Sequence, residues 1–100
     1  MKVKIETSSV KKVYLTDIIA LDPISVYLDD FGEGKGQITI TCSGEFWTAF
    51  WGNMGDSNMT EFFLSCDNDY LSKKLSTVRL NKRNGEYLYK IIDAVKGGLK

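Results

Sequence analysis

Three carboxylates, Asp29, Asp30 and Glu33, lie close together in the sequence and could in principle bind a metal ion or serve acid–base catalysis. The residues before and among them alternate between apolar and polar side chains, a pattern that predicts a β-strand over 24–31. Adjacent side chains of a strand point to opposite faces, so Asp29 and Asp30 cannot converge on one ligand. We therefore expect the three carboxylates to be solvated at the end of a β-hairpin.

The chain has two cysteines, Cys42 and Cys66, and no histidine. Because the cysteines do not form a Cys-x-x-Cys arrangement, a zinc site built from cysteine and histidine is excluded by ligand count. Cys42 is a poor candidate nucleophile, because no histidine can act as its base. We expect both thiols to be reduced and buried. The sequence thus predicts no metal site, no cofactor, no catalytic residue and no enzymatic activity.

A glycine-rich segment, GEGKG, follows the first carboxylates at residues 32–36. It lacks the Gly-x-x-x-x-Gly-Lys-Ser/Thr spacing of a phosphate-binding loop, and it joins two strands rather than a strand and a helix. Glycine supplies the positive φ angles that tight turns need, so the segment is interpreted as a turn. The alternating runs on either side, 24–31 and 37–43, then form an antiparallel hairpin.

The sequence predicts an α+β fold in a single domain over residues 1–100. In this fold an antiparallel β-meander of three to four strands is followed by two to three helices packed on one face. Besides the hairpin, a strand is predicted at 45–52, with further strand signals at 2–6 and 13–16. Helices are predicted at 59–66, at 68–75, and from about residue 84 to a stop at Gly97 and Gly98. The predicted core consists of Leu28, Ile38, Ile40, Phe62, Ile91, Ile92 and Val95.

The strand at 45–52 carries aromatic side chains on both of its faces. One face holds Trp47 and Trp51, and the other holds Phe46 and Phe50. If helices cover one side of the sheet, one aromatic set is core and the other is at least partly exposed. The alternative is that the final helix and the loop at 52–58 wrap the second side. An exposed aromatic set would mark a contact with a protein or a nucleic acid.

The formal net charge is zero, but the charges are segregated along the chain. Residues 13–72 hold ten acidic side chains against one lysine, whereas residues 73–100 hold eight basic side chains against two acidic ones. Two explanations fit this segregation. Either the basic ends of the chain fold back against the acidic middle, or the acidic middle is exposed to a partner. The N-terminus lacks a continuous apolar stretch, and no run is long enough to span a membrane, so we expect a cytoplasmic location.

Five features of the sequence follow one another in a longer pattern. They are a turn with an acidic residue, Phe and Gly; an alternating strand that contains a cysteine; a segment that runs from Trp to Met-Gly; a segment that runs from Phe to Cys-Asp; and a C-terminal helix with Tyr and Leu. With these features the chain resembles a family of small proteins encoded by bacteriophages and prophages, over about two-thirds of its length. The resemblance implies a phage origin and a shared environment for the two cysteines, and it transfers no catalytic residue. The matching positions are Asp30, Phe31, Gly32, Cys42, Trp47, Gly52, Met54, Gly55, Phe62, Cys66, Asp67, Tyr70 and Leu71.

Small phage accessory proteins often act by binding, so the first hypothesis is a protein-binding inhibitor or modulator of a host nucleic-acid-handling or defence complex. Its partner would be a host protein with a basic surface, in the cytoplasm of the bacterial host. The predicted contact residues are Asp29, Asp30, Glu33, Trp47 and Trp51. The alternative is an accessory protein of replication or recombination that binds single-stranded nucleic acid, with a tryptophan as stacking platform and a basic C-terminal region. The zero net charge counts against this alternative.

Overall fold

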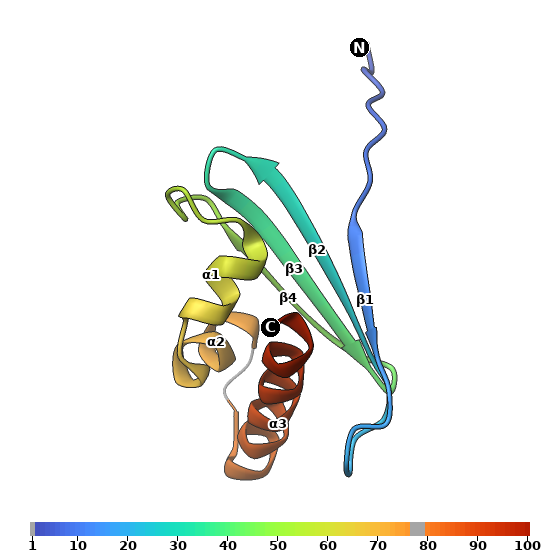
Figure 1. Cartoon of the computed structure of the whole chain (residues 1–100), viewed down its shortest axis with the longest axis vertical. Coiled ribbons are helices and arrows are strands. Elements are labelled where there is room, and N and C mark those ends of the chain that lie inside the picture. The colour runs from blue at the N-terminus through green and yellow to red at the C-terminus, as the bar shows by residue number, and fades with distance from the viewer. Residues whose placement is uncertain (1, 77–79) are drawn as a thin grey trace.

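The computed structural model describes residues 2–76 and 80–100, and these residues form four strands followed by three helices. The strands pair in the order β1-β2-β3-β4, all antiparallel, and the helices lie on one side of the sheet (Figure 1). The predicted α+β class is therefore confirmed. The elements are β1 (Lys11–Leu15), β2 (Ile24–Gly32), β3 (Lys35–Cys42), β4 (Glu45–Trp51), α1 (Met59–Ser65), α2 (Asn68–Leu75) and α3 (Lys82–Leu99).

The hairpin of β2 and β3 closes where the glycine-rich segment predicts it. Glu33 and Gly34 form its two-residue turn, with φ angles of 54° and 73°. Positive φ at both central residues is typical of a type I′ turn, whose twist matches that of the flanking strands. At Gly34 the absence of a side chain is also required by space, because a Cβ there would lie 2.6 Å from the backbone oxygen of Gly55.

Side-chain caps begin the three helices. Asn58 and Glu61 form a capping box at the start of α1, Asp67 accepts a hydrogen bond from the backbone of Tyr70 in α2, and Asn81 caps α3. The predicted stop of the last helix is wrong, because α3 continues through Gly97 and Gly98 to Leu99. The reason is tertiary: a Cβ at Gly98 would collide with the side chain of Leu15, so the glycine lets α3 approach β1.

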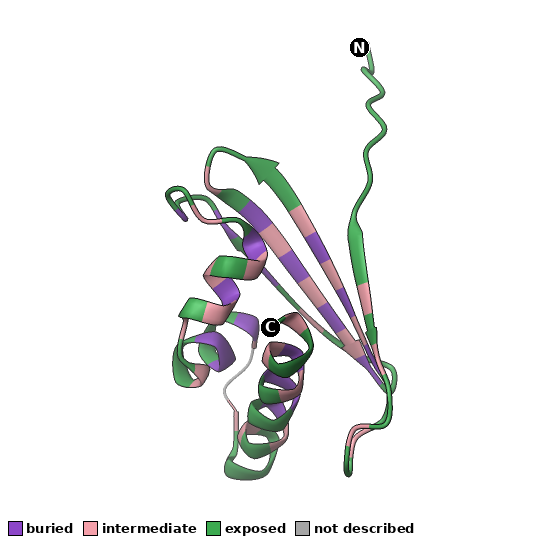
Figure 2. Ribbon diagram, in the orientation of Figure 1, coloured by how far each residue is buried: buried purple, intermediate pink, exposed green. Residues whose placement is uncertain are grey.

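The core lies between the sheet and the helices, and the buried residues alternate along β2 and β3 (Figure 2). Six of the seven predicted core residues are buried there. The exception is Phe62, which is half-buried at the margin, whereas its neighbour Phe63 is fully buried. Neighbouring side chains of a helix point about 100° apart. The sequence therefore predicts correctly that this helix packs on the core, but it assigns the buried position to Phe62 instead of Phe63.

The N-terminal segment is the largest departure from the predicted elements. Residues 2–10 form no strand, and the segment extends away from the sheet (Figure 1). Val3 and Ile5 alternate with charged residues as in an edge strand, yet both side chains are largely exposed. Alternation stabilises a strand only when one face is buried, and this segment has no core to face. The strand signal at 13–16 is confirmed, since β1 covers most of it.

Candidate functional site

The hairpin end and the loop between β4 and α1 meet at one end of the molecule (Figure 1). The backbone N–H of Met54 donates to the carbonyl oxygen of Gly34 at 2.8 Å, which ties the two segments together. This contact brings Asp56 to the carboxylates that the sequence analysis singled out. We call Asp29, Asp30, Glu33 and Asp56 the acidic tip; the last three line one shallow hollow together with Lys35.

The three predicted carboxylates of the acidic tip have different environments. Glu33 is exposed in the turn, and Asp29 is half-buried on the side of the sheet that faces away from the helices. Asp30 points the other way, and its Oδ1 accepts a hydrogen bond of 2.7 Å from the backbone N–H of Met59 at the start of α1. Asp30 is exposed, as expected, but it is also engaged in the fold, because a helix N-terminus offers free N–H donors that stabilise a carboxylate.

Both tryptophans lie on the side of the sheet that the helices cover. Trp51 is only 6% exposed: its Nε1 donates to the hydroxyl of Tyr70 at 2.8 Å, and the Lys74 ammonium lies 5.6 Å from its ring centroid. Trp47 is half-buried against Tyr87, with ring centroids 6.1 Å apart. Neither is the freely exposed anchor that the sequence analysis expected. A buried indole needs a partner for its N–H, and α2 supplies one through Tyr70.

The exposed aromatic side chains are phenylalanines on the opposite side. Phe46 is 70% exposed and Phe50 is 50% exposed, and Phe31, which is 52% exposed, packs against Phe50 with ring centroids 5.9 Å apart. Phe50 pairs across the sheet with Gln37, which in turn pairs with Asp29, so the Phe31–Phe50 pair adjoins the acidic tip. The alternation along β4 predicts its two aromatic faces correctly, but the predicted contact residues are the tryptophans rather than the more exposed phenylalanines.

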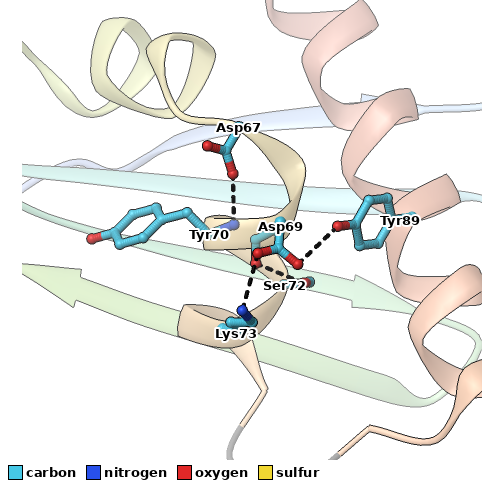
Figure 3. Close-up of polar contacts among 6 residues, drawn as sticks. All are labelled: Asp67, Asp69, Tyr70, Ser72, Lys73 and Tyr89. Carbon is cyan, nitrogen blue, oxygen red and sulfur yellow. Dashed lines mark hydrogen bonds and ion pairs between the residues drawn. The ribbon is translucent and has the colours of Figure 1, made fainter.

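A second polar cluster joins α2 to α3 on the helical side (Figure 3). Asp69 accepts a hydrogen bond from the Tyr89 hydroxyl at 3.2 Å and forms an ion pair of 3.0 Å with Lys73. The hydrogen bonds from Lys73 and Tyr89 lower the pKa of Asp69, and the bond to Asp69 raises the pKa of Lys73. Desolvation and the bond to Asp69 raise the pKa of Tyr89. The pKa of each of the three groups is shifted away from neutral pH, so the cluster suits a structural contact better than proton transfer.

The cysteines are free thiols with different neighbours. Cys42 is buried, and its thiol donates to the carbonyl oxygen of Asp22 at 3.6 Å and accepts from the Tyr87 hydroxyl at 3.5 Å. Cys66 is half-buried between α1 and α2, where desolvation raises its pKa. The prediction of buried thiols is confirmed for Cys42 and holds only in part for Cys66. A raised pKa makes the Cys66 thiolate scarce at neutral pH, so this thiol is not activated.

Within the described residues, no group of three or more acidic or cysteine side chains is arranged to hold a metal ion. Among the same residues, no helix is long and apolar enough to cross a membrane. Two surfaces of the described residues carry exposed aromatic side chains: the acidic tip with its phenylalanine pair, and the open side of the sheet.

Comparison with known proteins bears on the origin of the chain. No curated protein and no solved structure matches it. A family model described as a phage family matches residues 3–100, which is nearly the whole length of the chain. The match extends beyond the segments that carried the resemblance in sequence and includes the N-terminal segment and β1. The chain belongs to this phage family.

Proposed function

We propose that this phage protein acts by binding, as an inhibitor or modulator of a host nucleic-acid-handling or defence complex. The contact surface consists of the acidic tip and the Phe31–Phe50 pair, and the partner is a host protein with a basic surface in the bacterial cytoplasm. The action is non-catalytic. The observation that carries the proposal is an exposed aromatic pair that adjoins Asp29, at the hairpin end where Asp30, Glu33 and Asp56 line one hollow.

The aromatic pair supplies the affinity in this proposal. Phe31 and Phe50 are each about half exposed, and they contact one another rather than the core. Aromatic side chains that are buried on binding dominate the energy of many interfaces, while their polar surroundings exclude water and set the register. A partner that covers the pair would remove a large apolar area from water.

The carboxylates supply charge complementarity. Asp29, Glu33 and Asp56 are not engaged as Asp30 is, at the N-terminus of α1, and Lys35 is the one basic residue lining the same hollow. Charges at the rim of an interface act mainly on the association rate and on its dependence on salt. A surface that binds nucleic acid is basic, so carboxylates at the tip favour encounter with such a protein.

The tip is also held by several backbone contacts, which favours tight binding. The type I′ turn, the bond between Met54 and Gly34 and the bond between Asp30 and Met59 hold the hairpin, the loop and α1 together. A surface that is ordered before binding loses less conformational entropy when the partner docks. The backbone of the tip therefore needs little rearrangement to present Phe31 and Glu33.

The experiment compares three variants of the full chain with wild type as bait in host lysate. One carries Asp29→Asn, Glu33→Gln and Asp56→Asn, the second carries Phe31→Ser and Phe50→Ser, and the third is a control with Ile19→Ser. Ile19 is 94% exposed and lies in the loop between β1 and β2, outside the tip. Proteins captured by wild type and control but not by either tip variant are the candidate partners.

Purified candidates then decide the mechanism by their binding rates. We expect the carboxylate variant to associate more slowly, with a weaker dependence on salt, and the phenylalanine variant to dissociate faster. If all versions recover the same proteins in equal amounts at low and high salt, the acidic tip is not the contact surface.

A further inference from the structure

The open side of the sheet offers a second surface at the end opposite the acidic tip. Tyr14, Ser25, Thr41 and Phe46 form one cross-strand row from β1 to β4 on this side. The two outer residues are aromatic and largely exposed, Tyr14 at 60% and Phe46 at 70%, and the two inner ones are small and polar. The aromatic ends of the row are three strand spacings apart, which is roughly 14 Å. The hydroxyl groups of Ser25 and Thr41 lie between them and form the floor of the row.

A lysine lies beside this row. The Lys12 ammonium is 5.8 Å from the ring centroid of Tyr14 and 5.6 Å from that of Tyr27. Lys12 pairs with Tyr27 across the sheet, so both side chains share the open face with the row. At an exposed site such cation–π contacts are weak, so the ammonium can leave the rings for a stronger anionic partner. We call Lys12, Tyr14, Tyr27, Thr41 and Phe46 the open platform.

The edge of the sheet beside the open platform is basic. Residues 1–16 contain Lys2, Lys4, Lys11 and Lys12 against a single acidic residue, Glu6. The zero net charge of the whole chain conceals this local excess. The exposed segment 2–10 precedes β1 directly and leaves it at the end toward the hairpin of β2 and β3 (Figure 1), so Lys12 is the lysine that lies on the open platform itself.

From these observations we infer that the open platform binds single-stranded nucleic acid. The bases stack on Tyr14 and Phe46, the hydroxyl groups of the floor hydrogen-bond to base edges, and Lys12 contacts a phosphate. Stacking on exposed aromatic side chains requires unpaired bases, whose faces are hidden in a duplex. This platform differs from the one expected from the sequence, which relied on a tryptophan and on the basic C-terminal region.

A second copy of the chain is the other occupant to consider for an open sheet face. Two such faces packed against each other would remove both Lys12 ammonium groups from water, at a cost unless carboxylates met them. A phosphate satisfies Lys12 directly. Charge complementarity therefore favours nucleic acid over self-association on this face.

The test measures fluorescence anisotropy of a labelled oligothymidine of about fifteen nucleotides, within the range of site sizes of small single-strand-binding modules. The full chain is titrated against this probe and against a duplex of the same length, at salt concentrations from about 50 to 200 mM. We expect saturable binding that is tighter for the single strand and weakens with salt.

Two variants target the open platform. Tyr14→Ala with Phe46→Ala removes the stacking surfaces, which should weaken binding roughly 5- to 150-fold for each base that is no longer stacked. Lys12→Gln should lower the slope of log affinity against log salt by about 0.7 if this lysine neutralises one phosphate. All three side chains are exposed, so circular dichroism and thermal unfolding should show an unchanged fold.

Matched controls lie on the helical side. Tyr89→Ala removes a partly exposed aromatic side chain together with its bond to Asp69, so its fold is checked in the same way as that of the platform variants; Lys82→Gln removes the same charge as Lys12→Gln. The inference is overturned if no saturable binding occurs at low salt, or if these controls weaken binding as much as the platform variants. It is also overturned if the protein is a dimer that Tyr14→Ala with Phe46→Ala converts to a monomer, because a second copy then covers the face.

Discussion

The covered and open sides of the sheet are built from alternate residues of the same strands. In the two central strands, the residues that face the covered side differ sharply in type from those that face the open side. Toward the helices β2 and β3 present aliphatic side chains such as Ile24 and Ile40, which are fully buried. Toward the open side they present mainly serine, threonine, glutamine and Asp29, with Tyr27 and, at the hairpin end, Phe31 as aromatic exceptions. The central strands therefore carry an unambiguous signal about which side the helices cover.

The edge strand β4 carries no such signal. It is aromatic on both sides, with Trp47 and Trp51 toward the helices and Phe46 and Phe50 toward the open side. The covered aromatics gain partners from the helices, such as Tyr70 for the indole of Trp51. On the open side, Phe50 packs only against Phe31, as far as ring contacts among the described residues go. Hydrophobicity alone does not identify a core side chain at a sheet edge; the neighbours that cover it do.

The largest expected effect contrasts core and open-face truncations. Ile91→Ala and Ile40→Ala should each lower the free energy of unfolding by about 2–5 kcal/mol, because both side chains are fully buried. Phe46→Ala should change it by no more than about 0.5 kcal/mol, since the ring is largely exposed. Urea unfolding followed by tryptophan fluorescence measures all three. A reduction under about 0.5 kcal/mol for Ile91→Ala would remove α3 from the core and undo the contrast.

The next effect concerns the two glycines of the hairpin end. Gly32 and Gly34 both have positive φ, 83° and 73°, so alanine at either position should cost about 1–2 kcal/mol. A Cβ at Gly32 meets open space among the described residues, whereas one at Gly34 meets the Gly55 backbone. Gly34→Ala should therefore cost a further ~1–3 kcal/mol. Equal melting temperatures for the two variants would show that the hairpin and the loop are not packed together at the tip.

A smaller effect separates two adjacent carboxylates that face opposite sides. Asp30→Ala removes the acceptor for the Met59 N–H and should cost about 0.5–2 kcal/mol, as the removal of a helix cap does. Asp29→Ala, on the open side, should stay within about 0.5 kcal/mol of wild type. The midpoints of urea unfolding at neutral pH measure the difference. If Asp29→Ala is the more destabilising of the two, the assignment of Asp30 to the helix N-terminus fails.

The smallest effect is a pH dependence at the margin of the covered side. The hydrogen bond to Cys42, with burial as a second cause, raises the pKa of Tyr87 to about 12. The folded state thus keeps a proton that an unfolded tyrosine releases near pH 10, so this contribution to stability is present below pH 10 and disappears between about pH 10 and 12.

Tyr87→Phe has no proton to release, so its stability should fall less steeply than that of wild type across this window. In an absorbance titration of the phenolate, the difference between wild type and Tyr87→Phe isolates the ionisation of Tyr87, which should occur at about pH 12. A difference signal centred near pH 10 would contradict the bond to Cys42.

Much of the fold could be predicted because its signals are local. The period-two alternation of β2 and β3, the turn glycines and the caps at Asn58 and Asp67 involve neighbours in sequence. The helix at 68–75 was predicted to the residue for this reason. The acidic tip was predicted only in part: the hairpin carboxylates were identified, but Asp56 joins them through a contact between two loops.

The errors share a cause, which is packing between elements distant in sequence. Residues 2–6 have the pattern of a strand and no surface to pack on, whereas Gly98 has the character of a helix stop and is kept in α3 by its contact with Leu15. Asp30 has the sequence context of a solvated carboxylate, yet it accepts the N–H of Met59. In each case the local preference amounts to about 1 kcal/mol or less, and tertiary contacts outweigh it.

Backbone geometry and side-chain period act over a few residues, so the α+β class, the hairpin, the starts of α1 and α2 and the membership of the central strands in the core follow from the sequence alone. The exposure of the phenylalanines of β4 and the covering of its tryptophans follow only from tertiary packing. Both sets are apolar enough to be core, and the choice depends on which side α2 and α3 pack against. That choice is made by the summed burial of side chains from β2, β3 and the helices, which no single stretch of the sequence contains.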